Sequence, residues 1–98
     1  MNRYARSVEY EWDPEKDRIN QRLHGVSFAE ASTVFLDPLA ATVSDERFAM
    51  DEFRFRTTGY TLTNRLVIVA HTDRDDRIRV ISARKVTARE QRQYEQKS

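Results

Sequence analysis

The sequence contains no cysteine, and this absence removes several kinds of chemistry at once. Disulfides, thiolate nucleophiles and cysteine-ligated zinc sites are excluded. Only two histidines are present, His24 and His71, and no carboxylate lies at a recognisable metal-ligand spacing from either. The sequence therefore predicts a protein that uses no metal ion or other cofactor.

Long hydrophobic runs and a large net charge are also missing. No apolar run approaches the roughly 20 residues that cross a bilayer, and the N-terminus lacks the apolar region of a signal peptide. We therefore expect a cytoplasmic protein without a membrane partner. The formal net charge is only +1, but acidic residues gather at positions 9–17 and 45–52 while the C-terminal segment is basic. This segregation predicts one acidic and one basic surface.

The 98 residues predict one domain, 1–98, whose first half carries clear helix boundaries. Residues 8–12 suit a short strand. Asp13 followed by a proline is a strong helix start, and Gly25 is a natural helix end. Ser27 with Glu30 forms the pattern of a capping box and predicts a second helix through residue 35, closed by the Asp-Pro pair at 37–38.

The second half of the sequence has the composition of strands. Residues 40–43 suit a short strand, and residues 53–56 alternate apolar and basic side chains, which is typical of a strand with one basic face. After a turn at 59–64, the apolar run 66–70 predicts a central strand covered on both faces. A charged hairpin turn at 73–76 leads into an antiparallel strand at 78–83.

A C-terminal helix is expected to begin after Thr87, with Glu90 completing a capping box. The predicted order of elements is thus β-α-α-β-β-β-β-α. It describes an α+β fold, with a small antiparallel sheet packed with two N-terminal helices and a C-terminal helix.

Basic residues concentrate where the last strand meets the last helix. They are Arg79, Arg84, Lys85, Arg89 and Arg92, with only Glu90 to offset them. The guanidinium group presents a fixed fork of donors that matches phosphate oxygens, so the cluster favours binding of a phosphodiester.

Five sequence blocks resemble those of the BrnT-type toxins of type II toxin–antitoxin pairs. They are EWDPEK (11–16), NQRLHGVSF (20–28), VF and DP (34–38), IRVISARK (78–85), and the pairs Arg89-Glu90 and Tyr94-Glu95. The chain departs from the family pattern at Leu23, where a basic residue is usual, and in the longer turn at 73–76.

The resemblance implies a RelE-like fold and a metal-independent endoribonuclease that halts translation. It also implies a cognate antitoxin of the BrnA type with a ribbon-helix-helix part. Toxin and antitoxin would form a hetero-oligomer that represses its own operon, so operator DNA would be bound only through the antitoxin complex.

Metal-free RNA cleavage uses the substrate's 2′-hydroxyl as nucleophile and needs an acid, a base and cations around the phosphate. We predict His71, Arg79, Arg84 and Lys85 as catalytic residues and Arg54, Arg56 and Tyr94 as RNA-binding residues. His24, beside the glycine that ends the first helix, is interpreted as a partner of the helix dipole.

The strand register decides which of these residues meet. A symmetric turn at 73–76 would put Arg84 on the face of His71 and Arg79 on the other face, whereas a one-residue slip would bring Arg79 beside His71. A symmetric turn near Leu62 and Thr63 would set the pair Arg54 and Arg56 on the face of His71.

Each predicted site residue also has a structural interpretation. His71 could hydrogen-bond a loop, Arg79 could pair with a helix carboxylate, and Tyr94 could anchor the last helix. The alternative function is a non-catalytic module that binds a partner or RNA without cutting it. A DNA-binding regulator is less well supported, because no helix carries a basic recognition surface.

Overall fold

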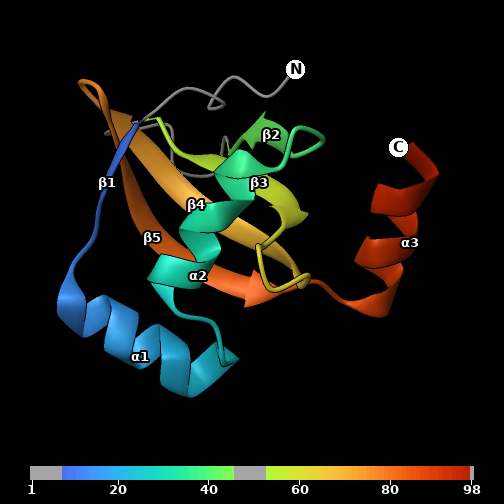
Figure 1. Cartoon of the computed structure of the whole chain (residues 1–98), viewed down its shortest axis with the longest axis horizontal. Helices are drawn as coiled ribbons and strands as arrows, with labels where there is room; N and C mark the ends of the chain where they lie inside the picture. The colour runs from blue at the N-terminus through green and yellow to red at the C-terminus, as the bar shows by residue number, and fades with distance from the viewer. Residues whose placement is uncertain (1–7, 46–52, 98) are drawn as a thin grey trace.

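The computed structural model describes residues 8–45 and 53–97, apart from the side chain of residue 97. Within them the chain forms a five-stranded sheet and three α-helices, with one 3₁₀ helix (Figure 1). The elements are β1 (Glu9–Glu11), α1 (Pro14–His24), α2 (Phe28–Ser32), η1 (Thr33–Leu36), β2 (Ala41–Ser44), β3 (Phe55–Tyr60), β4 (Leu66–Arg74), β5 (Arg77–Lys85) and α3 (Ala88–Lys97). The predicted α+β class and order of elements are confirmed.

The strands lie in the order β1-β5-β4-β3-β2, so β4 is the central strand, as the sequence predicts. Strands β2 to β5 pair antiparallel, but β1 pairs parallel to β5. The prediction of a purely antiparallel sheet is therefore wrong. The cause is the connection: α1 and α2 carry the chain from β1 across the sheet, so β1 is not joined to its neighbour by a hairpin (Figure 1). The RelE-like character implied by the resemblance stays a prediction.

Only one face of the sheet is covered by α1 and α2. Apolar side chains of α2, η1 and the preceding loop pack there against inward-facing residues of β4 and β5. The core consists of Val26, Phe28, Ala31, Val34, Phe35, Val67, Val69, Ile78, Val80 and Ala83. On the opposite face, which we call the open face, Ile68 and Ala70 of β4 are only half-buried. The prediction that the central strand is covered on both faces is wrong, because the two helices lie on the same side.

The predicted helix boundaries are largely confirmed. The Asp13 carboxylate accepts from the backbone N–H of Glu15, and Gly25 ends α1 with a φ of +68°. Thr87 and Glu90 exchange both hydrogen bonds of the capping box at 2.8 and 3.1 Å. At α2 only half of the predicted box forms: Ser27 Oγ accepts from the N–H of Glu30 at 3.0 Å, but the Glu30 carboxylate binds elsewhere.

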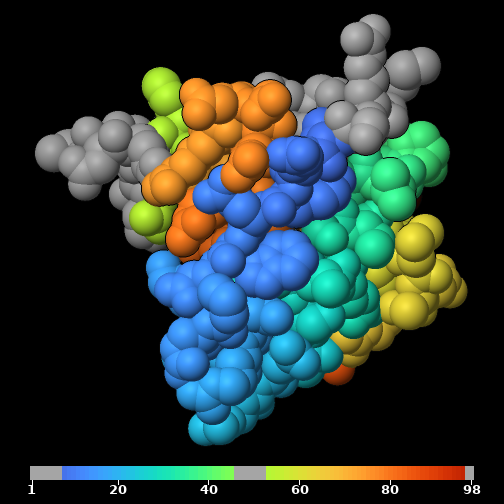
Figure 2. Space-filling model, turned by 60° about the vertical axis from the view of Figure 1, so that its left-hand side comes forward, coloured from blue at the N-terminus to red at the C-terminus, as the bar shows by residue number. Residues whose placement is uncertain are grey.

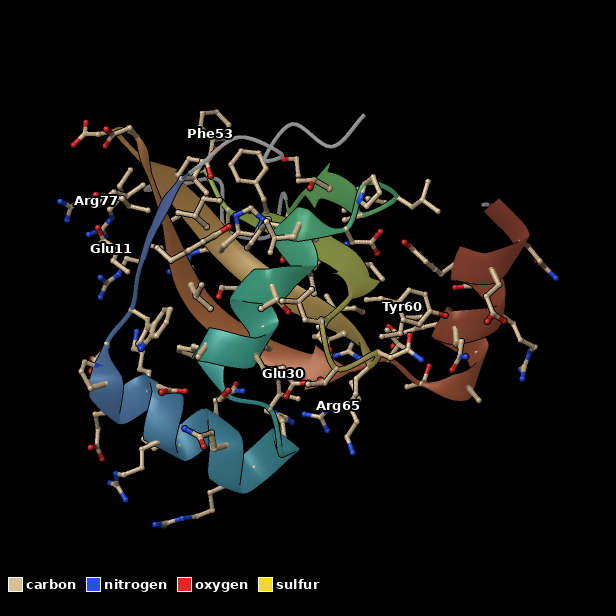
Figure 3. All side chains as sticks on the ribbon, viewed as in Figure 1. Glu11, Glu30, Phe53, Tyr60, Arg65 and Arg77 are labelled. Carbon is tan, nitrogen blue, oxygen red and sulfur yellow. The ribbon has the colours of Figure 1, made fainter. Side chains whose placement is uncertain are left out.

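That carboxylate holds the β3–β4 loop against the start of α2. Arg65 donates from Nε and Nη2 to the two Glu30 oxygens at 2.8 and 2.6 Å, and its Nη2 also donates to the Gly25 carbonyl (Figure 3). The hydrogen bonds from Arg65 lower the pKa of Glu30 to about 2. In Figure 2 the loop, drawn in yellow, lies directly beside α2.

Strand β3 differs from its predicted bounds at both ends, beginning at Phe55 and continuing to Tyr60. Gly59, expected in a turn, lies inside the strand. A Cβ there would lie 3.0 Å from the Ala40 Cβ, so glycine permits this close approach of two chain segments.

Helix α1 closes the edge of β5 beyond its short pairing with β1. The buried Asn20 amide donates to the Ala83 carbonyl at 2.8 Å and accepts from the Ala83 N–H at 3.1 Å. These two hydrogen bonds satisfy the backbone groups of Ala83 that a neighbouring strand would otherwise bind, and they fix the end of α1 beside the end of β5. No helix of the described residues is long and apolar enough to cross a membrane.

Candidate active site

A bulge in the β4–β5 hairpin decides which side chains share a face. The hairpin turn is at 75–76 and not at 73–76, because Arg74 pairs with Arg77. His71 therefore pairs with Val80, and Arg79 still lies on the other face, as expected for a symmetric turn, because the register differs by two residues. The bulge lies at the next residue of β5: Ala70 pairs with Ser82, so Ile81 is left as an extra residue without a partner in the register. Beyond it Arg84 pairs with Ile68 on the open face. The predicted placement of Arg84 with His71 is therefore wrong, since one extra residue reverses the alternation.

The β3–β4 loop likewise reverses the expected position of the strand arginines. Tyr60 pairs with Leu66 across five intervening residues, so the loop is centred on Thr63 and not between two residues. Phe55 then pairs with His71, and Arg56 pairs with Ala70 on the open face. The prediction that Arg54 and Arg56 lie on the face of His71 is wrong for this reason.

His71 lies in the core and is fully buried. Its Nε2 lies 2.7 Å from Thr57 Oγ1, and its Nδ1 lies 3.7 Å from a carboxylate oxygen of Asp73. The ring stacks on Phe55 and meets Phe35 edge-on, with centroids 5.7 and 4.9 Å away. The predicted cluster of His71 with Arg54, Arg56 and either Arg79 or Arg84 does not form.

The arginines converge instead in a pocket of about 330 Å³ on the open face. Its charged and titratable lining residues are His24, Asp45, Arg54, Arg56 and Arg84. Its other lining residues are Ile68, Ala70, Ile81, Ser82 and Ala83. The pocket thus combines three guanidinium groups, one carboxylate and an exposed imidazole.

His24 is the residue of this pocket that sequence reasoning missed. It follows Asn20 by four residues, so both lie on the same side of α1. Because Asn20 is bonded to Ala83, His24 is carried to the end of β5, where it meets Arg84 at the pocket. The Asn-x-x-x-His spacing was the available signal, but it has meaning only once Asn20 is known to bind the strand.

Arg56 lines the pocket, and its Nε lies near Asp45. Its Nε lies 3.8 Å from a carboxylate oxygen of Asp45, which is almost fully buried. The Arg56 Nε is itself buried and has no hydrogen-bond partner among the described residues. A buried donor without a hydrogen bond costs free energy. Of the predicted acidic segment 45–52, residues 46–52 lie outside the described residues.

Arg84 is held by Glu90 at the start of α3. Its Nη1 and Nη2 donate to the two Glu90 oxygens at 2.8 and 2.9 Å, and Nη1 also reaches the Lys85 carbonyl. The bonds from Arg84 are the main cause that lowers the pKa of Glu90 to about 2. Guanidinium has five N–H donors, so Nε–H and one Nη2 N–H remain to bind an anion.

The other predicted site residues lie away from this pocket. Lys85 pairs with Val67 and is on the face opposite Arg84. Arg79 donates to a carboxylate oxygen of Glu11 at 2.9 Å, so its partner is in β1 and not in a helix. Tyr94 anchors α3: its hydroxyl donates to the Leu39 carbonyl at 3.0 Å, and its ring meets that of Tyr60, which points toward α3 in Figure 3.

Comparison with known proteins identifies the family. The sequence model described as "Ribonuclease toxin, BrnT, of type II toxin-antitoxin system" matches residues 12–90, most of the chain. The chain belongs to the BrnT toxin family. It is thus a ribonuclease toxin of a type II toxin–antitoxin system, with RNA as its target and an antitoxin as its partner. The charged residues of the open-face pocket all lie inside the matched region.

A solved structure of the same family supports the fold. The crystal structure of the Brucella abortus ribonuclease toxin BrnT superimposes with a TM-score of 0.65, covering 83% of this chain and 99% of that chain at 19% sequence identity. No curated protein matches the sequence. Among the described residues, no group of three histidine or acidic side chains is placed to hold a metal ion.

Proposed function

We propose that the open-face pocket is the active site, and that this toxin is an endoribonuclease that cleaves RNA without a metal ion and so inhibits translation. The observation that carries the proposal is the convergence of His24 with Arg54, Arg56 and Arg84 at one pocket. An imidazole near neutral pH can exchange a proton, and guanidinium groups can stabilise the charge that develops on a phosphate.

In the proposed reaction the substrate supplies its own nucleophile. The 2′-oxygen bonds to the adjacent phosphorus, His24 accepts the proton of that hydroxyl, and the bond from phosphorus to the 5′-oxygen breaks. The departing oxygen takes a proton from water. The products are a 2′,3′-cyclic phosphate and a 5′-hydroxyl, and the three arginines contact the non-bridging oxygens throughout.

The residues first predicted as catalytic receive a revised assignment. Of the four, only Arg84 lies at the pocket, while Arg79 and Lys85 would contribute at most to the general attraction for RNA. His71 would stabilise the core that supports β3 and β4. Arg54 and Arg56 keep their proposed RNA-binding role.

The proposal extends to the partner. We propose that the antitoxin is of the BrnA type, with a ribbon-helix-helix part, and that the hetero-oligomer reaches operator DNA only through the antitoxin. Family membership supports this assignment. Copurification with a candidate antitoxin, followed by RNA cleavage and operator-binding assays of toxin, antitoxin and complex, tests it. The complex is expected to lose ribonuclease activity and to bind the operator, whereas the toxin alone binds none.

The enzymatic proposal is tested with the purified chain and a defined RNA in excess EDTA. Wild-type protein is expected to give discrete fragments with cyclic-phosphate and 5′-hydroxyl ends. The double variant Arg54→Ala, Arg56→Ala should cleave at least about 100-fold more slowly, because each pocket donor contributes a few kcal/mol to transition-state stabilisation. The matched control Arg18→Ala, Arg77→Ala removes the same charge from exposed positions that do not line the pocket and should cleave normally.

Two results would contradict the proposal. Cleavage that requires a divalent cation would exclude the metal-free mechanism. Equal loss of cleavage in the test and control variants would show that only the overall charge matters, and that the pocket is not the reaction site.

A further inference from the structure

A second hollow, of about 340 Å³, adjoins the pocket on the open face. Arg56 and Ile68 line both cavities, so the two are direct neighbours. The remaining lining comes from β2, β3, α3 and the short segment between β5 and α3. It consists of Ala41, Val43, Thr58, Val86, Glu90, Gln93 and Tyr94.

The chemistry of this hollow suits a nucleobase. Four aliphatic side chains form apolar walls, and the Tyr94 ring adds an aromatic surface. Besides Arg56, which the hollow shares with the pocket, the polar groups of the lining include the Thr58 hydroxyl, the Gln93 amide and the Glu90 carboxylate. A base likewise has apolar faces and a polar edge, and proteins bind unpaired RNA bases by stacking and by hydrogen bonds to that edge.

Two residues of α3 that are held by hydrogen bonds form one side of this hollow. Tyr94 is fixed through its hydroxyl on the Leu39 carbonyl, and Glu90 is fixed by Arg84 and by the capping box at Thr87. Gln93 differs from both, because it is exposed and its amide makes no hydrogen bond to a described residue. A glutamine amide offers a donor and an acceptor side by side, the pattern that reads a base edge.

We infer that this hollow is a specificity subsite, in which Gln93 reads the nucleobase next to the phosphate held by Arg56. The inference rests on the proposed function, since it takes the RNA to lie on the open face.

The test compares Gln93→Ala with the control Gln91→Ala, which removes an exposed α3 amide that does not line the hollow. Each protein is incubated with a random-sequence RNA pool in EDTA, and base frequencies around the cuts are counted. Gln93→Ala should reduce the base preference at one position about 2- to 10-fold, which corresponds to the net free energy of one hydrogen bond. The total amount of cleavage should be retained. Gln91→Ala should keep the wild-type preference.

A binding measurement makes the inference testable without cleavage. The affinities of short 2′-O-methyl homopolymers of each base are measured for the same three proteins. Wild type and Gln91→Ala should favour one base, and Gln93→Ala should not. An unchanged preference in Gln93→Ala, or none in wild type, would overturn the inference while EDTA-resistant cleavage still supported the proposed function. A base preference lost in Gln93→Ala without any cleavage would support the subsite and reject the reaction.

Discussion

One histidine lies in the core on the covered face and the other lines the open-face pocket from the end of α1, and the two have opposite surroundings. On the covered face His71 is fully buried between Phe35 and Phe55 and bonded to Thr57. On the open face His24 is exposed and shares a pocket with three arginines. Burial and aromatic packing make the first suited to stability, while solvent access and neighbouring cations make the second suited to proton transfer beside a phosphate.

The largest effect is expected from removing the open-face imidazole. His24→Gln should lower the rate of RNA cleavage by about 10² to 10⁴, the usual contribution of a general acid or base. Because the side chain is exposed, the free energy of unfolding should change by less than about 0.5 kcal/mol. Single-turnover cleavage and urea unfolding measure the two quantities. A variant that cleaves at the wild-type rate would contradict the assignment.

The covered-face histidine should show the reverse behaviour. His71→Ala leaves a cavity beside Phe35 and Phe55 and deprives the buried Thr57 hydroxyl of a partner, so it should destabilise the fold by about 2–4 kcal/mol. Cleavage per folded molecule should stay near the wild-type rate. Urea unfolding gives the stability, and activity is normalised to the folded fraction from circular dichroism. A stable but inactive variant would restore His71 as a catalytic candidate.

A smaller effect is expected at Glu30, which ties the β3–β4 loop to α2. Glu30→Gln should cost about 1–2 kcal/mol at neutral pH, because charge-assisted bonds from Arg65 are lost. The pKa of Glu30 falls from 4.5 to about 2 on folding, so its contribution is present above pH 4.5 and lost as the pH falls toward 2.

Unfolding at a series of pH values should therefore show a shallower acid dependence for Glu30→Gln than for wild type. Glu95→Gln, at an exposed position of α3, serves as the control and should follow the wild-type curve. Parallel curves for Glu30→Gln and wild type would show that the Arg65 pair contributes nothing to acid stability.

The smallest effect is expected at Glu90, at the exposed start of α3. Glu90→Gln weakens the capping box and the bond to Arg84, so α3 should be destabilised by about 0.5–1 kcal/mol. Amide hydrogen exchange should become faster in α3 while the core strands stay protected. Uniformly faster exchange would instead mean that α3 unfolds only together with the sheet.

The features predicted correctly from the sequence depend on neighbouring residues. Asp13 and Gly25 bound a helix because capping involves atoms a few positions away, and the same holds for Thr87 with Glu90. The β4–β5 hairpin turn was likewise visible in its charged residues. Family membership was visible in the sequence blocks, most of which fall inside the region matched by the family.

The composition of the site depends on features that local patterns do not encode. One bulge at Ile81 moves Arg84 to the open face, and one odd loop centred on Thr63 moves Arg56 there as well. Neither is evident in the sequence, yet the loop reverses the faces of all of β3 and the bulge reverses those of the residues of β5 that follow it. His24 joins the pocket through the contact between Asn20 and Ala83, which are 63 residues apart. Strand alternation correctly grouped Arg54 with Arg56 but assigned the pair to the wrong face, and in β5 it failed because the bulge separates the faces of Val80 and Arg84.

The most direct measurement of the central claim uses neighbouring methyl groups of β4. Ile68 and Ala70 face the open side, whereas Val67 and Val69 belong to the core on the covered side. Methyl-labelled protein is titrated with a short 2′-O-methyl RNA, which binds without being cut, and chemical shifts are followed by NMR. The Ile68 and Ala70 methyl signals should shift while those of Val67 and Val69 stay nearly fixed. Shifts confined to Val67 and Val69 or to the α2 side chains would contradict the assignment of the open face as the RNA site.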